Sequence, residues 1–105
     1  MAAEGVVIRF NYTGVADEVP HDATHITVDQ SVTVIPEEAF YDNRSIVEVI
    51  FGPNVKRVEE CAFNWCPSLR RLIMPGVEVV ERRAFINCRT LTDVECGKLE
   101  IIKAY

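Results

Sequence analysis

An internal repeat constrains the fold of this chain more than any other feature of its sequence. Alanine–aromatic pairs recur at steps of 23, 22 and 20 residues: Ala39-Phe40, Ala62-Phe63, Ala84-Phe85 and Ala104-Tyr105. Apolar side chains keep fixed distances from the pairs, as Ile35, Val58 and Val80 do five positions before the phenylalanines. A period of about 20 to 29 residues with this pattern is typical of a solenoid, in which each repeat buries its apolar side against the next. We therefore expect a stacked repeat protein.

Short segments within each repeat predict β-strands, because their residues place side chains inward, outward and inward again. These segments are 26–28, 49–51, 72–74 and 94–96. The segments 32–35 and 55–58 predict a second short strand or extended turn in each repeat. The segments 37–41, 60–65 and 82–87 have room for only one turn of α- or 3₁₀-helix. The expected fold class is a mainly β repeat solenoid with a short parallel sheet.

The first 25 residues differ from the rest of the chain. Residues 6–12 alternate like a strand but fall outside the repeat register, so we expect them to cap the first repeat. The predicted organisation is a cap strand and connector over 1–25, followed by about three and a half repeats over 26–105.

Charge and hydropathy exclude some classes of partner. The net charge of −5 is typical of a protein that does not bind nucleic acid, which requires a basic footprint. The sequence has no apolar run that reaches the roughly 18 residues needed for direct membrane insertion. Residues 1–5 lack the basic start of a signal peptide, which favours an intracellular location. Two glycosylation tripeptides, at Asn11 and Asn43, keep a secreted or cell-surface location as the alternative.

The chain offers no credible catalytic or metal-binding constellation, and we expect no cofactor. Its two histidines, His21 and His25, lie four residues apart. Pro20 precedes them and a strand follows, so we do not expect them to share one face of a helix as metal ligands. No pair of its cysteines has the C-x-x-C spacing of a redox or zinc motif. Free thiols are favoured for the cysteines, with disulfides and a metal site left open as alternatives. The cysteines are Cys61, Cys66, Cys88 and Cys96.

The better functional signal lies at positions that the core does not need. Stacking the repeats puts Ile50 beside Ile73 on the outer sheet face, next to Glu95. One residue earlier in each strand, Arg71 falls between Glu48 and Asp93, which predicts cross-repeat ion pairs. A second cross-repeat pair, Lys56 with Glu78, is also expected. Tryptophan is enriched at binding hot spots, so Trp65 is a candidate anchor on a turn. The candidate partner-binding residues are Ile50, Ile73, Glu48, Arg71, Asp93, Glu95 and Trp65.

The last repeat ends in apolar residues and has no polar capping repeat. An uncapped solenoid exposes its core and its unpaired strand edge. We therefore expect that a protein partner or a second copy of the chain covers this C-terminal edge, with a chain cut from a longer array of repeats as the third alternative. Its candidate residues are Leu99, Ile101, Ile102 and Tyr105.

The repeat resembles the BspA-type leucine-rich repeat. The motif runs from Val55 and Val58 through Ala62-Phe63, Cys66, Leu69 and Leu72 to Met74-Pro75, and a second copy starts at Val77. The resemblance spans residues 26–102 and implies a right-handed solenoid with one face lined by parallel strands. The first repeat departs from the pattern, with Asn43 in place of the usual cysteine. The family implies a non-catalytic protein-interaction or scaffold module, such as a small subunit of a larger complex. The alternative is a fragment of a secreted or cell-surface adhesive repeat protein.

Overall fold

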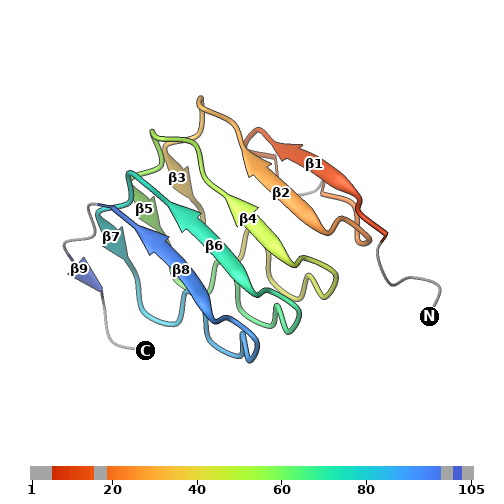
Figure 1. Ribbon diagram of the computed structural model, residues 1–105. Helices are drawn as coiled ribbons and strands as arrows, with labels where there is room; N and C mark the ends of the chain where they lie inside the picture. Colours follow the sequence, from red (N-terminus) through yellow and green to blue (C-terminus); the bar gives the residue numbers. More distant parts are fainter. Residues whose placement is uncertain (1–5, 16–18, 98–100, 103–105) are drawn as a thin grey trace.

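The computed structural model describes residues 6–15, 19–97 and 101–102 and arranges them as a parallel β-solenoid of two sheets (Figure 1). The five-stranded sheet contains, in spatial order, β1 (Arg9–Tyr12), β2 (His25–Val28), β4 (Glu48–Ile50), β6 (Arg71–Met74) and β8 (Asp93–Cys96). The four-stranded sheet contains β3 (Val34–Ile35), β5 (Arg57–Val58), β7 (Val79–Val80) and β9 (Ile101–Ile102). The predicted repeat solenoid is thereby confirmed.

Equivalent residues of successive repeats stand side by side in the five-stranded sheet. Val49 pairs with Ile26 on one side and with Leu72 on the other, and Leu72 in turn pairs with Val94. We call this inward-facing set, which begins with Phe10 on β1, the apolar row. The spacing of the apolar residues in the sequence therefore predicts the strand register correctly.

Stacked aromatic rings form the centre of the core. The rings of Phe40 and Phe63 lie 4.9 Å apart at 14°, and those of Phe63 and Phe85 lie 5.2 Å apart at 19°. Tyr12 closes the stack with its ring 4.9 Å from that of Phe40. Such ring pairs add stability beyond the area they bury. This stack explains why an aromatic residue recurs once in each repeat.

The turns that carry the Ala-Phe pairs are not helical. The residue before each alanine has a left-handed backbone, as Glu38, Cys61 and Arg83 show with φ near 60°. A left-handed residue interrupts an α- or 3₁₀-helix. The amide of Phe40 then donates to Ala62 O at 2.8 Å in the next repeat, instead of to a carbonyl of its own segment. The one-turn helical segments expected at these positions are therefore replaced by hydrogen-bonded turns.

The bend after β6 brings two repeats into backbone contact. A Cβ atom added at Gly76 would lie 2.2 Å from Pro53 O, which is far inside the contact limit. Only glycine allows the two bends to stack this closely. Glycine at position 76 is therefore required by the packing of adjacent turns.

The strand near the N-terminus joins the main sheet. β1 pairs in parallel with β2, with Arg9 beside His25 and Tyr12 beside Val28. Tyr12 is fully buried, and burial raises the pKa of its hydroxyl. The boundary between a cap over 1–25 and repeats over 26–105 remains a prediction.

Candidate binding surface

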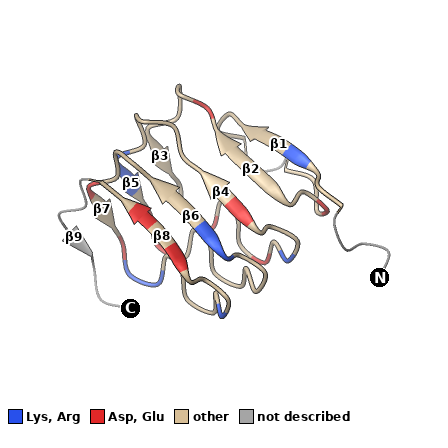
Figure 2. Ribbon diagram, viewed as in Figure 1, with Lys and Arg blue, Asp and Glu red and all other residues tan. Residues whose placement is uncertain are grey.

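A row of charged side chains crosses the outer face of the five-stranded sheet at the start of its strands. The register aligns Arg9, His25, Glu48, Arg71 and Asp93, which we call the charged row. Figure 2 shows the alternating signs of the charges on β1, β4, β6 and β8. The side chains of this row lie outside the core.

Arg71 is the centre of the charged row. Its guanidinium lies 3.5 Å from a Glu48 oxygen and 3.2 Å from an Asp93 oxygen. It also reaches Glu95 at 3.4 Å, and this hydrogen bond is the main reason why the pKa of Arg71 is raised. The structure thus brings Arg71 between Glu48 and Asp93, as the sequence indicates, and adds Glu95 to the same group.

Two isoleucines lie next to these charges. Ile50 pairs with Ile73, and both side chains are half-buried rather than fully exposed. Thr27 precedes them in the same row and Glu95 follows them. The result is a short apolar ridge bordered by polar side chains.

The expected pair between Lys56 and Glu78 does not form among the described residues. The Lys56 ammonium instead lies 3.5 Å from Pro53 O. The cross-repeat ion pair on this side joins Arg57 to Glu81 at 3.0 Å, because Arg57 begins β5 and its side chain reaches the next turn.

Trp65 lies away from the sheet face, on the turn between β5 and β6. Its side chain is 40% exposed and its backbone is left-handed, with φ at 63°. Asp42 and Asn87 hold the same position in their repeats with similar φ values. Short polar side chains tolerate this backbone better than tryptophan does. The structure does not bring Trp65 together with the isoleucine ridge.

The structure describes only part of the predicted C-terminal edge. Leu99 and Tyr105 lie outside the described residues, while Ile101 and Ile102 form β9 beside Val79 and Val80. Sequence reasoning missed a different exposed residue. Val94, an apolar-row residue, is 46% exposed.

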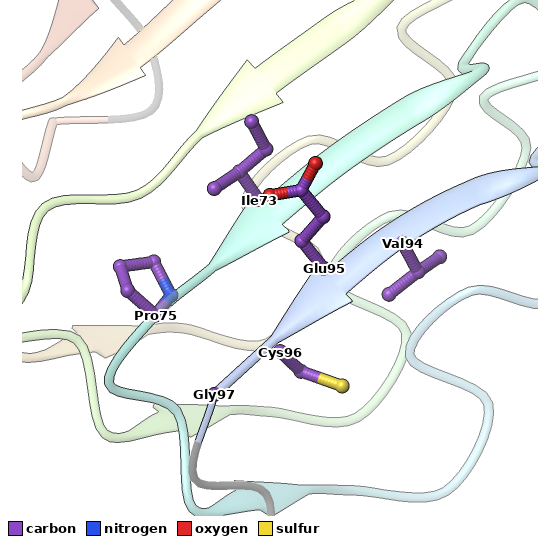
Figure 3. A pocket seen from close by; sticks show the side chains of 6 residues that line it. All are labelled: Ile73, Pro75, Val94, Glu95, Cys96 and Gly97. Carbon is purple, nitrogen blue, oxygen red and sulfur yellow. The ribbon is translucent and has the colours of Figure 1, made fainter.

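A cavity of about 510 Å³ lies beside Val94 at the end of β8, lined also by Ile73, Pro75, Glu95, Cys96 and Gly97. In Figure 3, Glu95 reaches toward Ile73, whereas Val94 and Cys96 lie on the other side of the β8 ribbon. The open part of the described solenoid is therefore centred on β8.

The cysteines are all free thiols in the structure, as the sequence favoured. Cys66 is buried and donates to Phe40 O at 3.1 Å, and Cys88 donates to Phe63 O at 3.0 Å. The neighbouring Cys88 thiol and burial both raise the pKa of Cys66. A protonated, buried thiol is a poor nucleophile. Cys66 therefore serves as a small core residue that satisfies a carbonyl of the preceding repeat. Cys88 makes the equivalent hydrogen bond but is only half-buried against the core, and the neighbouring Cys66 thiol lowers the pKa of Cys88.

The two histidines, both among the described residues, make local contacts only. His25 contacts Thr24 through Nδ1 at 2.8 Å, and His21 lies on a turn. Within the described ranges, no three His, Cys, Asp or Glu side chains are grouped so that they could hold a metal ion. A separate search of those same residues for a helix long and apolar enough to cross a membrane found none.

Comparison with models of known protein families identifies the family of this chain. The family model described as BspA type leucine rich repeat region (6 copies) matches residues 20–105. The chain therefore belongs to the BspA-type leucine-rich repeat family, as its motif indicates. No curated protein sequence matches the chain.

A solved structure shares the fold. It is a leucine rich cell surface protein from Faecalibacterium prausnitzii A2-165, with a TM-score of 0.63 and 18% sequence identity. The match covers 87% of this chain and 30% of that one, so the chain spans about a third of the length of its structural relative. The leucine-rich repeat is a fold of stacked repeats whose extended surfaces bind other proteins.

Proposed function

We propose that the chain is a non-catalytic protein-binding module of a secreted or cell-surface protein. The observation that carries the proposal is the outer face of the five-stranded sheet. There, the Ile50–Ile73 ridge lies directly beside the charged group formed by Arg71, Glu48, Asp93 and Glu95. An apolar centre with a charged border is the usual composition of a protein–protein interface. None of these side chains is needed to fill the core.

The proposed secreted or cell-surface location is supported by the structural relative rather than by the sheet face. The structural relative is a cell surface protein, and it extends well beyond the length that this chain matches. This supports a secreted or cell-surface adhesive repeat protein. The intracellular location favoured by residues 1–5 has no support from the relative, nor has a role as a small subunit of a complex.

Site-specific photo-crosslinking tests the binding face. A photoreactive phenylalanine analogue at Ile73 is exposed to a panel of purified extracellular proteins, and the same analogue at Val34 is the control. Val34 is a suitable control because it is exposed on the four-stranded sheet. We expect adducts of defined mass from position 73 and few from position 34, with the adducts lost when Arg71→Glu is added. Equal labelling from both positions would contradict the proposed face.

A further inference from the structure

The five-stranded sheet has two edges in the described structure, β1 and β8; the apolar-row residue of β1, Phe10, is half-buried, whereas that of β8, Val94, is exposed. Within this row, Val49 and Leu72 are 0% exposed, whereas Val94 on β8 is 46% exposed. Each inner residue has a neighbour on both sides, but Val94 has a strand on one side only. Among the described residues, β8 therefore has a partner strand on one side only.

The backbone of β8 can accept such a strand. A parallel strand that pairs on one side leaves alternate amide and carbonyl groups free on the other. An added strand binds these groups and uses side-chain rows for specificity. All four side chains of β8 are exposed, so nothing described on the chain blocks its approach.

The two carboxylates on β8 determine which charge is favoured on a strand that pairs with it. β8 contributes Asp93 and Glu95, while only Arg71 lies opposite them. A second β8 strand would bring four carboxylates onto one strand pair, and like charges on neighbouring strands are unfavourable. A strand with a basic residue in the charged row is favoured instead.

β1 is a strand of this kind, and it occupies the opposite edge. Arg9 begins β1 in the charged row, and Phe10 follows it in the apolar row. Arg9 is exposed, and it makes no ion pair with any other described residue. Placed beside β8 in the direction of the other strands, Arg9 would meet Asp93 and Phe10 would cover Val94. The next two rows would pair Asn11 with Glu95 and Tyr12 with Cys96.

We propose that a second copy of this chain adds its β1 to the β8 edge, in parallel and in the repeat register. The contact joins two different surfaces, so each copy keeps one edge open and further copies can follow. The expected product is a linear, head-to-tail series of solenoids. This contact shares Asp93 and Glu95 with the proposed binding face, but Arg9→Glu disrupts the contact without changing that face, so the two proposals can fail separately.

A charge-swap experiment tests the pairing of Arg9 with Asp93. Light scattering across a concentration series is expected to show the mass of the wild-type chain growing with concentration. Arg9→Glu and Asp93→Arg are each expected to remain monomeric. Their equimolar mixture, or the double variant, restores association because opposite charges meet again. Arg44→Glu is the matched control, since Arg44 is exposed on a turn and pairs only with Asp42 among the described residues.

Disulfide trapping gives a second readout that does not depend on charge. In a Cys96→Ser background, which removes the exposed native thiol of β8, the variant Asn11→Cys with Glu95→Cys places cysteines in one row at the two edges, and mild oxidation is expected to give covalent multiples of about 11.9 kDa. The control Thr27→Cys with Glu95→Cys uses the same row but an inner strand, and it is expected to give none. A wild-type chain that stays monomeric, or folded variants that associate regardless of charge, would overturn the proposal.

Discussion

The centre of the solenoid and its β8 edge are built from the same repeat, yet they differ in how completely they bury it. Leu72 is fully enclosed between Val49 and Val94, while Val94 itself is about half exposed. Met74 on β6 is 2% exposed, and Cys96, its register partner on β8, is exposed. The repeat motif therefore specifies the direction and register of a side chain, but the neighbouring turn determines whether that side chain is buried.

The largest expected difference concerns the apolar row. Leu72→Ala is expected to lower the free energy of unfolding by about 2–5 kcal/mol, because it leaves a cavity in a closed core. Val94→Ala at the equivalent position is expected to cost less than about 1 kcal/mol, since solvent already reaches that side chain. Urea denaturation of both variants measures the difference. Equal losses would show that β8 is as well covered as β6.

The next comparison concerns thiol reactivity. Cys96 is expected to react with a thiol reagent in the folded protein, whereas Cys66 reacts only after local opening. With an opening free energy of about 4 kcal/mol, Cys66 labels about 1,000-fold more slowly. The raised pKa of Cys66 acts in the same direction, because less thiolate is present. Mass spectrometry of labelled peptides over time gives both rates, and similar rates would contradict a closed centre.

The smallest expected difference concerns the bends. Gly76→Ala forces a Cβ atom against Pro53 O and is expected to cost about 1–3 kcal/mol. Gly97→Ala is the matched change in the next bend, where the nearest atom, Pro75 O, is 3.0 Å from the added Cβ. It is expected to cost less. Thermal unfolding of the two variants ranks them, and the reverse order would refute the close contact between inner bends.

The same contrast explains what could be predicted from the sequence. The spacing of Ile26, Val49 and Leu72 predicts the strand register, because stacking requires equivalent residues to coincide. The ion pairs of Arg71 with Glu48 and Asp93 follow from that register.

Other features depend on geometry that the repeat pattern does not contain. The turns at Glu38 and Cys61 adopt left-handed backbones, although neither residue is a glycine that would indicate this. The exposure of Val94 is set by the absence of a described strand beyond β8. Arg9 can be assigned to the charged row only once β1 is known to lie in the same sheet as β2. Whether the candidate residues bind a partner remains a prediction.

Residue-resolved hydrogen exchange tests the central claim most directly, namely that a closed centre gives way to an open β8 edge. The account predicts slow exchange for the amides of β4 and β6 and much faster exchange for those of β8 in dilute protein. It also predicts that protection of β8 rises with concentration, as second copies add to it. Exchange that is equally slow in β6 and β8 at every concentration would contradict the account.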